Sequence, residues 1–111
     1  MSNLVVANTI RDQIANGVAV DGTKGFVAVR AWGSDNFTGS GEETEDNRGW
    51  LSFSVKGRSF KGAVKVKLMW NDTYRIEFWK TRRPSIKMVK SVDDVYCDQL
   101  TAVIDRYVEA A

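Results

Sequence analysis

The sequence predicts a single α+β domain, an antiparallel sheet of about five strands with an N-terminal and a C-terminal helix on one face. Its 111 residues are enough for one domain and too few for two. Between residues 50 and 80, apolar and polar residues alternate with the period of two that is typical of strands buried on one face. Near both ends of the chain, apolar residues instead recur every three or four positions, which indicates amphipathic helices.

The N-terminal half is expected to contain one helix, one strand and one long loop. Val6, Ile10 and Ile14 recur at a spacing of four, which predicts a helix. Residues 26–32 form a mostly apolar run, which is expected to be a strand buried on one face and partly covered on the other. Residues 33–49 are rich in glycine and acidic residues and almost devoid of apolar ones, so we expect a surface loop there.

The clearest strands are expected at residues 50–55, 64–70 and 74–79, where every second residue is apolar. Between the last two, Asn71 and Asp72 both tolerate positive φ and are predicted to form a two-residue hairpin turn. The alternation predicts two sets of side chains. The buried set comprises Val64, Val66, Ile76 and Phe78, joined by Leu100 and Val103 of the last helix, and the solvent-facing set comprises Lys65, Lys67, Arg75 and Lys87.

The C-terminal part is expected to contain a short edge strand and then a helix. Residues 85–89 are interpreted as the strand, with Ile86 and Met88 facing the core. Ser91 stands three residues before Asp94, a variant of the capping box, which predicts the start of the helix. The helix's apolar stripe is Tyr96, Leu100, Val103, Ile104, Tyr107 and Val108, opposite Asp98, Thr101 and Asp105.

Four short segments carry a family resemblance: L-S-F-S-V (51–55), V-K-V-K-L (64–68), N-D-T-Y-R-I-E-F (71–78) and V-Y-C-D-Q-L-T-A-V (95–103). In their order and spacing, residues 50–104 resemble a family of small uncharacterised proteins of bacteriophages and mobile elements. No activity is established for that family. The resemblance therefore implies a setting, the cytoplasm of a phage-infected bacterial cell, rather than a function.

The residues themselves favour a non-catalytic protein with neither a cofactor nor a metal. The chain has no histidine, the commonest general base and metal ligand. Cys97, the single cysteine, is expected to be a small buried residue of the last helix. Because a single cysteine cannot form an intramolecular disulfide, we expect a reducing, cytoplasmic compartment. The acids of residues 42–46 lack the ligand spacing of an EF-hand and are interpreted as a solvated loop. No apolar run is long enough for a membrane span, so no membrane partner is expected.

The charge distribution suggests a binding surface. The net charge is only +2, yet residues 56–90 contain eleven Lys and Arg against two acids, whereas residues 35–46 contain five acids and no base. The alternation is expected to place cations and tryptophans together on the sheet face away from the helices. Such a face could bind single-stranded nucleic acid, because Lys and Arg neutralise phosphates and bases stack on indole rings. The candidate single-stranded nucleic-acid site comprises Trp50, Lys65, Lys67, Arg75, Trp79, Arg82, Arg83 and Lys87, and Arg30 and Trp32 would extend it if residues 26–32 join the sheet.

The same cations and tryptophans permit two other interpretations. Lys and Arg are ordinary solvent-facing residues of a sheet, and cross-strand tryptophan pairs stabilise sheets without binding anything. Aromatic and Arg side chains are also the usual anchors of protein interfaces, so a host or phage protein is the second class of partner.

Overall fold

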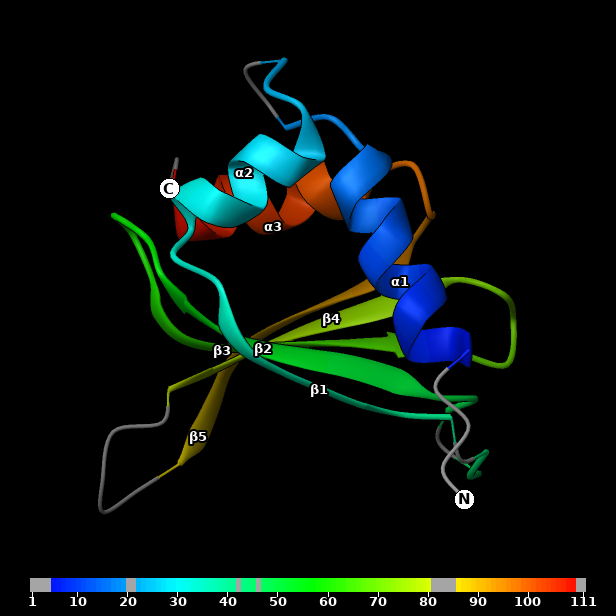
Figure 1. The fold of residues 1–111 in the computed structure, drawn as a ribbon. Coiled ribbons are helices and arrows are strands. Elements are labelled where there is room, and N and C mark those ends of the chain that lie inside the picture. Colours follow the sequence, from blue (N-terminus) through cyan, green and yellow to red (C-terminus); the bar gives the residue numbers. More distant parts are fainter. Residues whose placement is uncertain (1–4, 20–21, 42, 46, 81–85, 110–111) are drawn as a thin grey trace.

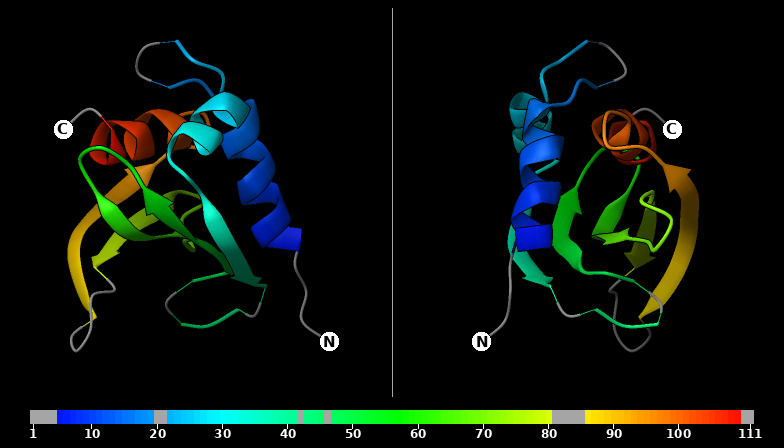
Figure 2. Two further views of the ribbon diagram at one scale, coloured as in Figure 1. Left: turned by 60° about the vertical axis from the view of Figure 1, so that its left-hand side comes forward. Right: turned by 90° about the vertical axis from the view of Figure 1, so that its right-hand side faces the viewer.

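The structure is a computed structural model that describes residues 5–19, 22–41, 43–45, 47–80 and 86–109. The elements in chain order are α1 (Val5–Asn16), α2 (Gly25–Ala31), β1 (Asp35–Ser40), β2 (Trp50–Lys56), β3 (Lys61–Leu68), β4 (Tyr74–Lys80), β5 (Lys87–Val95) and α3 (Leu100–Val108). The strands form one antiparallel sheet in the order β1-β2-β3-β4-β5. Figures 1 and 2 show that the sheet curls and that the helices cover one of its faces, which confirms the predicted α+β domain.

The core lies between the sheet and the helices. Alternate residues of β2, β3 and β4 point into it, as the period of two requires, and α1 and α3 contribute side chains spaced by four. The core side chains with the least exposure include Ile10, Phe53, Val64, Val66, Ile76, Phe78, Leu100, Ile104 and Val108. Val103, predicted to be buried, is only partly buried at the margin of this cluster.

The predicted strand at residues 26–32 is wrong, because this run forms α2. Ala28 and Trp32 are four positions apart and both buried, so the helix buries one side while Phe26 stays exposed. A run that is apolar at nearly every position has no periodicity by which a helix and a strand can be distinguished. The Trp32 indole Nε1–H donates to Asp105 Oδ1 of α3 at 2.9 Å. Neither Arg30 nor Trp32 therefore belongs to the sheet.

The predicted loop at residues 33–49 contains an edge strand, β1. Thr38 pairs with Ser52, and the Phe37 ring stacks on Phe53 with centroids 5.2 Å apart. Gly39 is required here because a Cβ at this position would lie 2.4 Å from the Cβ of Ala7 in α1. The polar composition of β1 concealed it, since an edge strand buries little and shows only weak alternation.

The last strand is longer, and the last helix starts later, than expected. β5 continues to Val95, and Asp94 lies in its second half with a φ of 57° rather than at a helix start. The pairing of β5 with β4 therefore outweighs the local capping pattern of Ser91 and Asp94, which would have started a helix there. Ile86 and Met88, predicted to face the core, are 68% and 43% exposed.

Because the helix starts later than predicted, several side chains lie in surroundings other than those expected. Tyr96 and Cys97 are exposed in the segment before α3, so neither belongs to a buried helix stripe. Thr101, expected on the polar side, is buried, and its hydroxyl donates to the Ile14 carbonyl at 2.7 Å. α3 is thereby attached to the end of α1.

The β3–β4 connection is also longer than the predicted two-residue turn. Met69 N–H donates to the Thr73 carbonyl, and Asp72 N–H donates back to the Met69 carbonyl. Asp72 has the expected positive φ, 66°. Trp70 lies in this loop and is exposed rather than inside a strand.

Candidate nucleic-acid interface

The sheet face away from the helices, called here the outer face, carries most of the site residues predicted from the sequence. Trp50 of β2, Lys65 and Lys67 of β3, and Arg75 and Trp79 of β4 all lie on it, because each alternates with a buried neighbour. Direct cross-strand partners join these residues into rows: Trp50 is opposite Lys67, and Lys67 is opposite Arg75. The structure thus brings five of the predicted residues together.

The remaining three predicted residues are not part of that group. Arg82 and Arg83 lie outside the described residues. Lys87 begins β5, is exposed and stands directly opposite Lys80 at the end of β4. The predicted site therefore does not form one continuous surface among the described residues.

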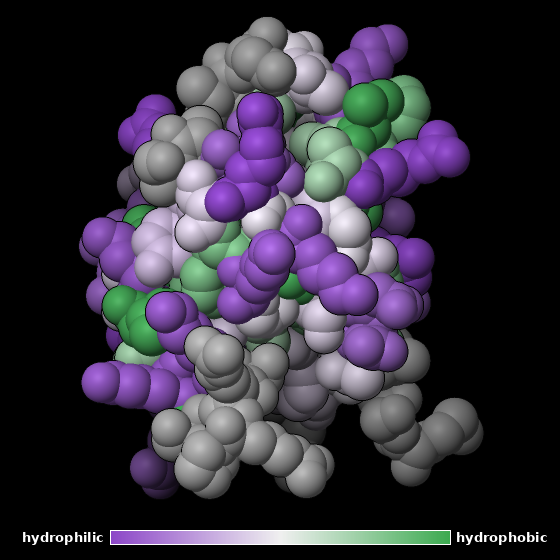
Figure 3. Space-filling view, turned by 90° about the vertical axis from the view of Figure 1, so that its left-hand side faces the viewer, coloured by the Kyte–Doolittle hydropathy of each residue, from purple (hydrophilic) through white to green (hydrophobic). Residues whose placement is uncertain are grey.

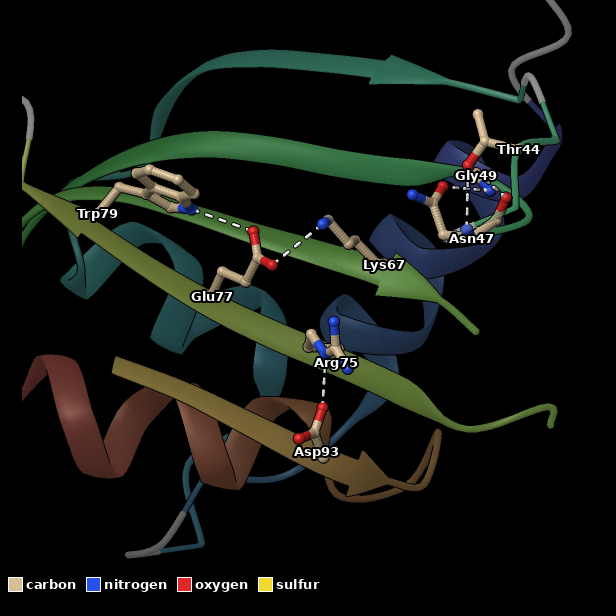
Figure 4. A network of polar contacts seen from close by, with 8 residues as sticks. All are labelled: Thr44, Asn47, Gly49, Lys67, Arg75, Glu77, Trp79 and Asp93. Atoms are coloured by element: carbon tan, nitrogen blue, oxygen red, sulfur yellow. Dashed lines mark hydrogen bonds and ion pairs between the residues drawn. The ribbon is translucent and has the colours of Figure 1, made fainter. Parts of the chain in front are cut away.

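At the centre of the outer face, one carboxylate engages two of the predicted residues (Figure 4). Glu77 Oε2 forms an ion pair with Lys67 Nζ at 3.0 Å, and Glu77 Oε1 accepts a hydrogen bond from Trp79 Nε1 at 3.1 Å. The Lys67 and Glu77 side chains are only 12% and 7% exposed. The expectation that Lys67 faces solvent is wrong, because its diagonal partner on β4 and the neighbouring long side chains cover it. Lys67 has its counter-charge within the chain.

Two other predicted cations are engaged in a similar way. The Lys65 Nζ lies 4.3 Å from the ring centroid of Trp50, a cation–π contact that occupies one side of the indole. Arg75 Nε donates to Asp93 Oδ1 of β5 (Figure 4). The outer face is therefore a connected polar layer in which cations meet carboxylates or an aromatic ring of the same chain.

A second group of cations surrounds a hollow of about 1040 Å³ at the end of the sheet where β2 turns into β3. Its cations, which we call the hairpin cluster, are Lys56, Arg58, Lys61 and Lys80. Asp35 is the one acidic residue among the described residues that line the hollow. In Figure 3, which views this side of the molecule, hydrophilic side chains project over the middle of the face.

The lysines of the hairpin cluster differ from those of the outer face in their partners. Lys56 and Lys61 stand directly opposite each other in the β2–β3 pair, so two like charges share one cross-strand position. Within the part of the chain that the structure describes, neither they nor Lys80 form an ion pair. Arg58 is 87% exposed and pairs with Glu109 at 3.2 Å.

The hairpin that carries this cluster is attached firmly to α3. Ser59 and Phe60 both donate their N–H groups to the Val108 carbonyl, at 2.8 and 3.2 Å. The buried Phe60 ring packs edge-on against Phe78. A Cβ at Gly57 would lie 2.1 Å from Val108 Cγ1, so only glycine allows this approach. The lysines thus project from a fixed scaffold.

None of the four cations of the hairpin cluster is among the candidate site residues predicted from the sequence. The available signal was their density, three cations within six residues of K-G-R-S-F-K. Their convergence with Lys80 depends on strand order, which the sequence does not state.

The comparisons with family models, with curated proteins and with solved structures found no match for this chain. None of the helices in the described residues is both long and apolar enough to cross a membrane. Among those residues, no three His, Cys, Asp or Glu side chains gather as ligands for a metal ion would.

Proposed function

We propose that this chain is a non-catalytic protein that binds single-stranded nucleic acid, with the hairpin cluster contacting phosphates and Trp79 offering a surface for base stacking. The observation that carries this proposal is the convergence of Lys56, Arg58, Lys61 and Lys80 on one hollow that a single acid lines among the described residues. Phosphate contacts of this kind supply most of the affinity of sequence-independent binding.

The facing pair of Lys56 and Lys61 supports a polyanionic ligand. Like charges directly opposite each other in a sheet destabilise it by about 0.2–1 kcal/mol. No acid of the described chain forms an ion pair with either lysine. A phosphate placed between the two ammonium groups would remove this repulsion and release the counterions that otherwise screen it.

The position of Trp79 supports a strand with unpaired bases. Trp79 directly precedes Lys80 and stands opposite Ala63, which in turn stands opposite Ser54. Both side chains are small, so we expect room for a base beside the indole on the outer face. The ring is only partly buried, and its bond to Glu77 fixes its orientation, so little side-chain entropy is lost when a base stacks on it.

A fluorescence-anisotropy titration with a labelled, unstructured oligonucleotide tests the proposal. Lys61→Glu should weaken binding, whereas Lys24→Glu, the same charge change at an exposed residue before α2, should leave the affinity much closer to that of the wild type. Raising the salt concentration from about 50 to 200 mM should weaken wild-type binding by about one to two decades if three or four cations contact phosphate. No binding at low salt would contradict the proposal and leave a protein partner as the better explanation.

A further inference from the structure

We propose that a small aromatic carboxylate binds in a second hollow, of about 200 Å³, between α1, α2 and the β1–β2 side of the sheet. α1 packs on β1 and β2, and α2 packs beside α1, so separate elements form the walls of this hollow (Figure 1). None of its lining residues also lines the hollow that the hairpin cluster surrounds. The proposed carboxylate site is therefore independent of the nucleic-acid site.

The lining of the second hollow is apolar apart from one cation. Among the described residues that line it, Arg11 of α1 has the one polar side chain, and the others are aliphatic or aromatic. Phe26 of α2 lines the hollow and is nevertheless 54% exposed, so a large apolar ring is left half in water. A ligand with a ring of its own would cover this surface and gain the free energy of its burial.

The volume selects a ligand with one ring and a short chain. An apolar cavity of about 150 Å³ holds a benzene molecule. The second hollow, at about 200 Å³, has space for such a ring and for a short aliphatic chain besides. An α-helix of a partner protein is about 10 Å across and could insert no more than a side chain. The size of the hollow therefore favours a free small molecule.

Arg11 supplies the charge that a carboxylate would complement. Its guanidinium carbon lies 4.4 Å from the ring centroid of Phe37, which also lines the hollow. Within the part of the chain that the structure describes, no carboxylate forms an ion pair with Arg11. The contact with Phe37 brings no acceptor oxygen to the guanidinium, whose N–H groups can still bind both oxygens of a carboxylate. The single cation of the lining thus selects an anionic group on the ligand.

The walls of the second hollow are held in place by contacts within the chain. Gly25 N–H, at the start of α2, donates to the Gly17 carbonyl just after α1 at 2.8 Å. A Cβ at Gly25 would lie 1.8 Å from the Ile14 carbonyl oxygen, so only glycine allows the two helices to approach this closely. On the sheet side, the Phe37 ring stacks on Phe53. A ligand would enter a preformed site and would lose little affinity to rearrangement.

An NMR titration with hydrocinnamate, a phenyl ring joined by a short chain to a carboxylate, tests the proposal. The amide chemical shifts of the residues that line the hollow should change saturably as hydrocinnamate is added. Hydrocinnamyl alcohol has the same ring and chain without the charge. It should bind at least about tenfold more weakly, because it cannot form the charge-assisted bonds to Arg11.

Three variants separate the charge of the site from its shape. Arg11→Gln keeps a good helix former, and should weaken hydrocinnamate binding by about tenfold while it leaves binding of the alcohol unchanged. Ala15→Leu fills part of the hollow and should weaken the binding of both ligands. The matched control is Arg30→Gln, the same change at an exposed residue of α2 that does not line the hollow, which should affect neither ligand.

Three results would overturn the proposal. The first is the absence of saturable shift changes in the lining residues at about 10 mM hydrocinnamate, which would mean that the hollow has no useful affinity for this class of ligand. The second is equal affinity of the wild type for the acid and the alcohol. The third is an Arg11→Gln variant that loses both ligands alike, since Arg11 would then maintain the shape of the hollow rather than bind a carboxylate.

Discussion

Two groups of lysines on the same sheet differ in whether the chain supplies their counter-charge. On the outer face, Lys67 is 3.0 Å from Glu77 and nearly covered. In the hairpin cluster, Lys56 faces Lys61, and neither makes an ion pair within the described residues. Both groups come from the basic stretch of residues 56–90. The difference shows that strand register, rather than the number of cations, decides which lysines are available to an external anion.

The largest expected effect concerns the covered pair. Glu77→Gln would remove the carboxylate that lies 3.0 Å from Lys67 Nζ in a site from which water is largely excluded, at a cost of about 3–5 kcal/mol in the free energy of unfolding. A urea titration measures this loss. The control is Asp93→Asn, which breaks the Arg75 pair, whose side chains are 57% and 33% exposed, and should cost about 0–1 kcal/mol. If both variants lost the same free energy of unfolding, the Lys67–Glu77 pair would be no more buried than the Arg75–Asp93 pair.

A second test compares the two groups of lysines in binding. Lys61→Gln should weaken oligonucleotide affinity by about tenfold, because one phosphate contact and its released counterions are lost. Lys65→Gln should change the affinity much less, because Lys65 already lies against the Trp50 ring. Fluorescence anisotropy at low salt measures both. If Lys65→Gln caused the greater loss, the outer face rather than the hairpin cluster would be the main contact.

The sequence predicted those parts of the fold in which burial follows one clear period. The strands around Val64, Val66 and Phe78 were confirmed because each has a buried face and an open face. α2 was missed because a run that is almost wholly apolar has no period, and β1 was missed because it is polar throughout much of its length.

The site was harder to predict than the fold. The sequence placed Lys65 and Lys67 on the correct face of the sheet, but could not show that Glu77 lies within reach of Lys67, because that contact is diagonal between strands. It also could not show that Lys56 faces Lys61 or that Lys80 joins them, because these positions depend on the length of the hairpin and on the strand order. Side-chain chemistry was visible in the sequence, whereas the choice of partners was not.

The smallest expected effect is a change in the stability of the fold, and whether this change is a gain or a loss is the informative result. Lys56→Gln removes one of two facing like charges and should stabilise the fold by about 0.2–1 kcal/mol, while it weakens oligonucleotide binding. An ordinary solvated lysine would show neither change. Thermal and urea unfolding measure the first effect, and anisotropy measures the second. The matched control is Lys24→Gln, at an exposed position outside the sheet, which should leave both quantities nearly unchanged.

A gain in stability together with a loss of binding would mean that the facing lysines destabilise the fold but are needed to bind a ligand. The gain should shrink as the salt concentration rises, because screening weakens the repulsion between the two exposed ammonium groups. A loss of stability in Lys56→Gln would contradict this argument, since it would show that the aliphatic part of the lysine packs usefully against the hairpin and that the charge repulsion is minor.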